Sequence, residues 1–209
     1  MRYYVEETKV INPPIDSCEW EKAEIGFVDK EPWTKNLFPS PKTTFKLLRG
    51  PEGLSVLMHT EETNLRAVEC ENGDVCNDSC MEFFYKPSPW DTRYFNFEVN
   101  PKGTMHLGLG ADRFDRVMIT EREALDIVTV VDNKGWSVKY YIPDSLINEW
   151  FPDEERLSSG NKSRIVRANF YKCGDKTEKP HYAAWSNIDT ELDDFHVPDF
   201  FGALVFKQI

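Results

Sequence analysis

Three pairs of short apolar segments, each pair separated by turn-forming residues, constrain the fold of this chain more than any other feature. The three turns are Gly50-Pro51-Glu52-Gly53, Asn100-Pro101-Lys102-Gly103 and Asp132-Asn133-Lys134-Gly135. Gly, Asn and Asp accept the backbone angles that tight turns need, and Pro presets one of them. Apolar segments on both sides of such turns predict β-hairpins. We therefore expect hairpins over residues 44–60, 94–109 and 124–142.

The other apolar segments are also short, and only one of them has the pattern of a helix. Residues 146–151 follow Pro143-Asp144-Ser145, which is typical of a capped helix start. Many short strands separated by turns favour an antiparallel β-sandwich, and 209 residues correspond to one domain. We expect an all-β antiparallel sandwich with one or two short helices over residues 1–209, with an irregular N-terminal wrap over 1–40 and the sandwich core over 41–209. Further strands are expected at 25–28, 80–85, 165–171 and 204–207.

The charge balance excludes two classes of partner. Asp and Glu number 36 against 25 Lys and Arg, which gives a net charge of -11. Nucleic-acid backbones and anionic membrane surfaces are bound by basic patches, so we expect neither nucleic acid nor a membrane as a partner. The chain also lacks a stretch of about 18 apolar residues, the length needed to span a bilayer.

The cysteines and the first residues of the chain bear on its compartment. The segment 1–7 has no apolar signal-peptide region, and five cysteines, an odd number, favour reduced thiols. We therefore expect a cytoplasmic protein with free, buried cysteines. Export by another route would make it extracytoplasmic and would allow a Cys76–Cys80 or Cys80–Cys173 disulfide. Cys70, Cys76 and Cys80 cluster in the sequence, but not at the spacing of a zinc site.

The second predicted hairpin has one apolar and one polar face, because side chains alternate along a strand. Its polar face carries short hydrogen-bonding groups and glycines, which let a ligand approach the backbone; the alternative is an ordinary solvated outer face. Planar Asn, Glu and Arg groups can each bond two adjacent hydroxyls, which suits sugar recognition. The polar faces of this hairpin and of the strands at 80–85 and 165–171 include Tyr94, Asn96, Glu98, Asn100, His106, Glu82, Arg167 and Asn169.

Aromatic residues make up 13% of the chain and form either a core or binding platforms. A sugar ring presents C–H faces that stack on Trp and Tyr, whose rings combine an apolar body with a polar tip. Trp90 and Trp185 fall in predicted loops and are candidate platforms, with Tyr94 as a third. Trp136 lies on a predicted strand and is expected in the core.

Five segments, in this order, resemble the motifs of the carbohydrate-binding module family 9-like domains, which are related to the DOMON-like domains. The resemblance covers roughly residues 44–206 and implies a β-sandwich that binds sugars, often glycan ends, without catalysis. The segments are 78–84 (DSCMEFF), 94–100 (YFNFEVN), 108–113 (GLGADR), 167–175 (RANFYKCGD) and 194–202 (DFHVPDFFG).

The same resemblance implies which side chains meet a carbohydrate ligand. Carboxylate and amide groups are expected on the sugar hydroxyls, and a Trp near the C-terminus on the ring face. Structural calcium also occurs in the family, so calcium is the cofactor that the resemblance implies. The matching positions are Glu82, Glu98 and Asn100 for polar contacts, Trp185 for stacking, and Asn169 and Arg113 as further contacts; Tyr94 and Trp90 complete the candidate site.

Two other functions stay open on this sequence. Glu82 and Glu98, if on neighbouring strands, would come within the about 5–9 Å that separates the paired carboxylates of glycosidases, which would make the chain a glycoside-acting enzyme. The polar face could instead be covered by a protein partner, which would make it an interaction module. The acidic segment 189–194 is either a solvated loop or a source of oxygen ligands for calcium.

Overall fold

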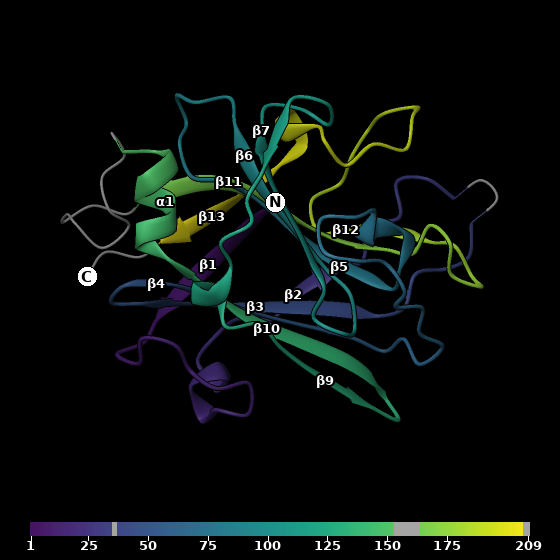
Figure 1. The fold of residues 1–209 in the computed structure, drawn as a ribbon, viewed down its shortest axis with the longest axis horizontal. Coiled ribbons are helices and arrows are strands. Elements are labelled where there is room, and N and C mark those ends of the chain that lie inside the picture. The colour runs from purple at the N-terminus through teal and green to yellow at the C-terminus, as the bar shows by residue number, and fades with distance from the viewer. Residues whose placement is uncertain (35–36, 153–163, 207–209) are drawn as a thin grey trace.

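The computed structural model describes residues 1–34, 37–152 and 164–206 and shows a mostly β protein with one α-helix in these ranges (Figure 1). Helix α1 spans Asp144–Trp150, and four 3-10 helices span Cys18–Glu21, Val75–Asn77, Glu123–Leu125 and Pro198–Phe200. The strands are β1 (Arg2–Glu7), β2 (Gly26–Val28), β3 (Thr43–Gly50), β4 (Gly53–Thr60), β5 (Cys80–Lys86), β6 (Tyr94–Val99), β7 (Met105–Gly110), β8 (Arg116–Met118), β9 (Val128–Asp132), β10 (Gly135–Pro143), β11 (Arg164–Cys173), β12 (Tyr182–Ala184) and β13 (Gly202–Phe206).

The strands form a curled sheet in the order β8-β7-β6-β5-β11-β13-β1-β3-β4-β10-β9, with β12 beside β11 and β2 beside β3. Strand β1 joins its two halves, because residues 2–5 pair with β13 and residues 6–7 pair with β3, both in parallel. We call the half with β5–β8 and β11–β13 sheet A, and the half with β2–β4, β9 and β10 sheet B. The other strand pairs of the described ranges are antiparallel. The predicted β-sandwich is therefore confirmed, and only the pairs made by β1 depart from an antiparallel arrangement.

The three predicted hairpins are present as β3–β4, β6–β7 and β9–β10. Gly103 and Gly135 in two of their turns have φ angles of 79° and 150°, a region that glycine enters without steric cost. A Cβ atom on Gly135 would also lie 1.9 Å from the carbonyl oxygen of Thr60. The third hairpin begins at Val128 and not at residue 124, because residues 123–125 form a 3-10 helix.

Strand β1 lies in the segment expected to be an irregular wrap, and the sequence pattern did not predict it. Only Tyr3 and Val5 of this strand are buried hydrophobic residues. Pairing with two strands far away in the sequence stabilises it, and a local pattern does not show such pairing. The three-residue strands β8 and β12 were not predicted either. Lys207, at the end of the strand expected over 204–207, lies outside the described residues.

The core between the two sheets is largely aromatic. Phe45 of sheet B stacks on Phe170 of sheet A with ring centroids 3.6 Å apart, and Phe97 of sheet A packs on Tyr140 of sheet B at 5.7 Å. Trp136 is buried here, as its strand position predicts. Each ring removes a large apolar area from water, so most of the aromatic content serves packing.

The outer face of sheet A is partly covered by the chain that connects β12 to β13. Ile188 and Phe201 of this connection pack against Phe84, Tyr94 and Tyr171 of the sheet. The outer face therefore has its own apolar layer along part of the strands, and its polar residues lie beyond that layer.

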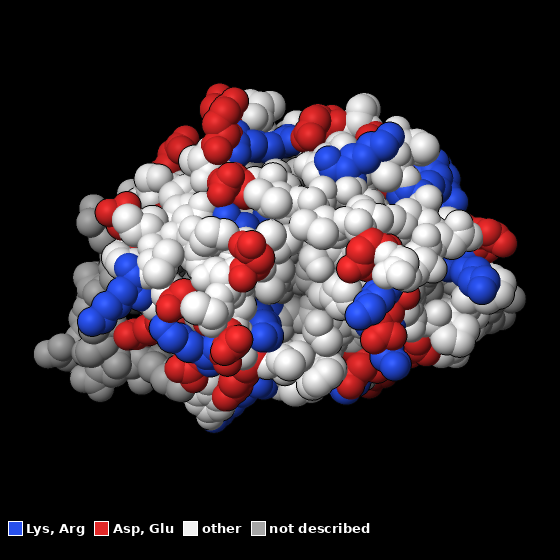
Figure 2. Space-filling model, turned by 90° about the horizontal axis from the view of Figure 1, so that it is seen from below, with Lys and Arg blue, Asp and Glu red and all other residues white. Residues whose placement is uncertain are grey.

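In the described ranges, none of the helices has the length and apolar character needed to cross a membrane. Acidic and basic side chains are interspersed over the face shown in Figure 2. The net charge of -11 is thus not gathered into one acidic field on that face.

Candidate functional site

A pocket of about 260 Å³ opens on the outer face of sheet A. Its floor comes from strands β5, β6, β7 and β11, on which the side chains alternate so that apolar residues enter the core and polar residues face the pocket. Its walls include Tyr182 and the segment 193–196 from the C-terminal part of the chain and Trp33 from the N-terminal part. The site therefore depends on long-range folding and not on one continuous motif.

The floor contains a row of residues that face each other across three strands. Glu82 of β5 lies opposite Glu98 of β6, which lies opposite His106 of β7. All three line the pocket, although Glu82 is only 2% exposed and Glu98 5% exposed. The strand register places two carboxyl groups and an imidazole side by side on one polar surface.

Two neighbouring side chains fix the orientation of Glu98. The Nδ2 atom of Asn96 donates a hydrogen bond of 2.6 Å to its Oε1 atom. Nη1 of Arg116 donates in turn to Oδ1 of Asn96 at 3.0 Å. Gly108 leaves room for this arrangement, since a Cβ atom there would lie 2.7 Å from Oδ1 of Asn96.

Glu82 has a strongly perturbed titration. Burial and then the charge of Glu98 raise its pKa well above the usual value, although the Cys173 thiol donates a hydrogen bond of 2.9 Å to its Oε1 atom. Burial disfavours the charged form of a carboxyl group, and a neighbouring carboxylate does the same. Glu82 therefore retains its proton to a higher pH than an exposed carboxyl does.

His106 presents an unused nitrogen atom. Its Nδ1 atom lies 3.0 Å from the carbonyl oxygen of Gly73 and must donate to it, because a carbonyl only accepts. In neutral imidazole this makes Nε2 an acceptor, and Nε2 is a buried polar atom without a partner in the described residues. A buried acceptor of this kind is costly unless a ligand or water bonds to it.

The rim combines carboxylates with two guanidinium groups. Burial, followed by the charge of Glu98, raises the pKa of Asp175 to about 6. Its Oδ1 atom is also buried without a partner in the described part of the chain. The charged residues that line the pocket are Asp74, Glu82, Glu98, Asp175, Asp193 and Asp194 on the acidic side and Arg113 and Arg116 on the basic side.

Three aromatic rings form one wall. Trp33 lies 5.6 Å from Phe195 and 6.1 Å from Tyr182, measured between ring centroids. The indole Nε1 of Trp33 donates to the carbonyl oxygen of Thr190 at 3.0 Å, which fixes the ring. Trp33 is only partly buried, so part of an oriented aromatic face remains available to a ligand.

Three of the eight site residues expected from the sequence line the pocket together, namely Glu82, Glu98 and Arg113. Asn100, two residues after Glu98, is fully buried. Its Nδ2 atom donates a hydrogen bond of 2.9 Å to Oδ2 of Asp78. Asn169 is also fully buried, and its amide bonds the backbone of Ser186 in both directions. These two amides thus tie loops to the strands.

The three expected aromatic residues lie elsewhere. Trp185 is 3% exposed and packs edge-on against Phe45 in the main core, 5.5 Å between centroids. Tyr94 is buried in the outer apolar layer, and its hydroxyl lies 2.8 Å from Nδ1 of His196. Trp90 is 90% exposed and borders a separate hollow beside Trp150.

The sequence pattern does not predict several of the residues that line the pocket. Trp33 stands in the segment 1–40 that is expected to be an irregular wrap, and Phe195 stands in the motif 194–202, from which no site residue is predicted. Arg116 and Tyr182 had no periodic signal, because their strands contain three residues each. Among the described residues, the acidic segment 189–194 does not bring three metal-ligating atoms together; Asp193 and Asp194 instead border the pocket.

The fold and the pocket define a class of protein: a β-sandwich that carries a small, polar, partly aromatic pocket on the outer face of one sheet. The model of carbohydrate-binding family 9 matches residues 13–206. The chain therefore belongs to that family.

Solved structures agree with this fold. A protein from Bacteroides uniformis ATCC 8492, assigned to carbohydrate binding by inference, is 25% identical with a TM-score of 0.81, over 99% of both chains. A carbohydrate-binding module of family 9 from Caldicellulosiruptor kristjanssonii, solved with glucose, is 13% identical with a TM-score of 0.70, over 100% of this chain and 97% of that one. Its structure with cellotriose gives 15% identity and a TM-score of 0.68, over 100% and 95%. No curated protein matches the chain.

Proposed function

We propose that this chain is a carbohydrate-binding protein that holds one end of a glycan in the pocket on sheet A. One observation carries the proposal: planar hydrogen-bonding groups on the floor and the partly exposed ring of Trp33 line the same small pocket. Sugar recognition needs both, because hydroxyl groups require paired donors and acceptors while the ring faces are apolar. The volume of about 260 Å³ is slightly below the range of about 300–1,000 Å³ for drug-sized ligands, which suits one or two sugar units.

The charged side chains that line the pocket favour neutral sugars over acidic ones. Six carboxyl groups and two guanidinium groups line the pocket, so an additional carboxylate on the ligand would be repelled. We therefore expect neutral sugars to bind better than uronic or sialic acids. Glucose and cellotriose, found in the family 9 module from C. kristjanssonii, are the first ligands to try.

Each residue then has a role. Glu98 and Glu82 bond sugar hydroxyls from the floor, Arg113 donates from the rim, and Trp33 stacks on the ring. Asn100, Asn169, Trp185 and Tyr94 act by holding the strands and loops in place, without contact to the sugar. Trp90 lies outside the site.

Isothermal titration calorimetry with glucose, cellobiose, cellotriose and a panel of neutral and acidic glycans tests the proposal. Trp33→Ala should abolish measurable heat of binding for the best ligand. Trp90→Ala is the matched control, because it removes an exposed Trp away from the pocket and should leave affinity unchanged. Absence of binding at millimolar sugar, or equal affinity of Trp33→Ala and the unaltered chain, would refute the assignment.

A second function, glycoside hydrolysis, is favoured by one observation. Glu82 and Glu98 are directly opposite each other, and the pKa of Glu82 is raised by burial and by Glu98. A carboxyl group with a raised pKa beside a second carboxyl group is the arrangement of a glycosidase acid and its partner. Release of nitrophenol from aryl glycosides that disappears in Glu82→Gln would establish this function in place of simple binding.

A further inference from the structure

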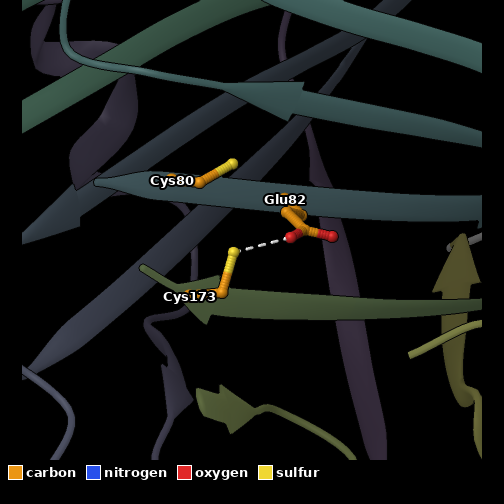
Figure 3. A group of neighbouring side chains, drawn as sticks. All are labelled: Cys80, Glu82 and Cys173. Carbon is orange, nitrogen blue, oxygen red and sulfur yellow. Dashed lines mark hydrogen bonds between the residues drawn. The ribbon is translucent and has the colours of Figure 1, made fainter. Parts of the chain in front are cut away.

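A second group of side chains, Cys80, Cys173 and Glu82, lies at the pocket floor, where Cys173 and Glu82 line the pocket and Cys80 is buried beside them; sugar binding uses only the carboxyl group. Cys80 of β5 and Cys173 of β11 are direct partners in the antiparallel register, and Glu82 follows Cys80 on the same face of β5. One ligand atom from each residue lies within 4.8 Å of the other two. Figure 3 shows the sulfur of Cys173 directed at the carboxylate of Glu82, with the hydrogen bond drawn dashed.

The three side chains are almost completely removed from water, with exposed fractions of 0% for Cys80, 1% for Cys173 and 2% for Glu82. Burying ionisable groups is costly unless they are paired. Lys172, next to Cys173 on β11, is itself compensated, because its Nζ atom lies 2.9 Å from a carboxylate oxygen of Glu62. Burial raises the pKa of both thiols and of Glu82. Burial thus favours the protonated forms when no metal is bound, and a cation held between the three would compensate the negative charges that form when their protons leave.

We propose that Cys80, Cys173 and Glu82 bind one Zn²⁺ ion on the floor of the pocket, with the fourth coordination position facing the pocket. Zn²⁺ is tetrahedral, with Zn–S distances of about 2.3 Å and Zn–O distances of about 2.0–2.2 Å. Such a site requires the ligand atoms to stand about 3.5–3.8 Å apart; they lie within 4.8 Å of one another here, so metal binding requires side-chain rotations that complete the geometry. Binding forms two Zn–S bonds and one Zn–O bond, and the protons of the two thiols and the carboxyl group leave for solvent.

The donor set selects the metal. Thiolates favour Zn²⁺ and other soft or borderline ions, whereas Ca²⁺ takes six to eight oxygen ligands. Two sulfurs and one carboxylate therefore do not fit calcium. Three protein ligands with an open fourth position are typical of zinc sites that also bind water or a ligand. Cys173 and Glu82 line the pocket, which supplies the path of entry and the open side.

The spacing of cysteines in the sequence does not reveal this site. The pairing of β5 with β11 brings Cys173 opposite Cys80. Of the three cysteines that cluster in the sequence, Cys70, Cys76 and Cys80, only Cys80 belongs to the proposed site. The proposal does not rest on sugar binding, and its test contains no sugar.

The test uses the whole chain, stripped of metal and kept reduced with a phosphine. Addition of Co²⁺, a spectroscopic substitute for Zn²⁺, should produce a thiolate-to-cobalt charge-transfer band that saturates at one ion per chain and is displaced by Zn²⁺. Cys173→Ser and Cys80→Ser should each weaken Zn²⁺ binding by at least about 100-fold, more than the about 10–100-fold typical of losing a hydrogen bond to a metal ligand. The isosteric Glu82→Gln should weaken it at least about tenfold.

Cys18→Ser and Cys70→Ser are the matched controls, because both thiols are exposed and neither belongs to the trio; both variants should bind Zn²⁺ as the unaltered chain does. Circular dichroism verifies that each variant is folded. Absence of the thiolate band in the folded, reduced, unaltered chain would overturn the proposal, whatever the variants do. A Cys80–Cys173 disulfide in the purified chain, with no metal binding after its reduction, would also overturn it.

Discussion

Glu82 and Glu98 face each other across strands β5 and β6, and both are almost fully buried in the pocket floor. The charge of Glu98 adds to burial in disfavouring the charged form of Glu82, so this pair lowers the stability of the fold. We expect Glu98→Gln to remove the repulsion, keep an oxygen acceptor for Asn96, and raise Tm by about 2–4 °C, the shift that about 1 kcal/mol gives in a chain of this size. The same change should weaken sugar binding by about tenfold or more. Scanning fluorimetry and calorimetry measure the two effects.

Glu191→Gln is the control for this prediction, because Glu191 is an exposed carboxyl group. It should alter neither Tm nor affinity. A lower Tm in Glu98→Gln together with unchanged affinity would mean that Glu98 is structural.

Trp185 and Trp90 should respond to truncation in opposite ways. Trp185 is 3% exposed and closely packed, since a Cβ atom on Gly202 would lie 2.4 Å from its ring. Trp185→Ala should lower the free energy of unfolding by about 3–5 kcal/mol, as large-to-small changes of buried aromatic residues do. Trp90→Ala should change it by less than about 0.5 kcal/mol, because the side chain is 90% exposed. Urea unfolding followed by circular dichroism measures both, and equal effects would contradict the assignment of Trp185 to the core.

Asn100 connects a turn to a buried carboxylate. Its Nδ2 atom donates to Asp78 at 2.9 Å, and its Oδ1 atom accepts from the backbone N–H groups of Lys102 and Thr104. Asn100→Ala leaves these partners unsatisfied and should cost about 2–3 kcal/mol of unfolding free energy. Lys102→Ala, an exposed change in the same turn, should be nearly neutral in urea unfolding. If both variants are equally stable, the amide does not hold the turn.

His196 should make stability depend on pH. Burial, followed by the charges of Arg116 and Arg113, lowers its pKa from about 6.5 to about 3, while its Nδ1 atom contacts the hydroxyl of Tyr94 at 2.8 Å. The imidazole of His196 takes up a proton near pH 6.5 in the unfolded chain but not in the folded chain. The stability that depends on a neutral His196 is therefore fully present above pH 6.5 and is lost as the pH falls toward 3. The groups acting on the imidazole are Arg116, Arg113, His106 and Asp112.

Urea unfolding at pH 7.5 and pH 5 should show a loss of about 1–2 kcal/mol that His196→Gln does not show. The difference between the two chains separates His196 from other groups that titrate in this range, such as Asp175. If the free energy of unfolding falls by the same amount between pH 7.5 and pH 5 in His196→Gln, His196 is excluded as the source of the pH dependence.

The sequence predicts the elements that local chemistry determines. The three hairpins follow from their turn residues, and the alternation of Phe95 and Phe97 with Asn96 and Glu98 predicts which face enters the core. Trp185 shows the limit of this reasoning, because the sequence places it in a loop but does not reveal that the loop folds back into the core. Trp33 shows the converse, since its place beside Phe195 arises only after the two ends of the chain pack together.

Strand β1 has a consequence for how the protein is made. Its pairing with β13 joins the first residues of the chain to residues 202–206, and its pairing with β3 joins the two sheets. On a ribosome, β1 emerges before both of its partners and lacks one of them until β13 has been synthesised. Contacts between residues so distant in sequence also slow folding. We expect the sandwich to close only after β13 has been synthesised, with β1 exposing an unpaired edge until then.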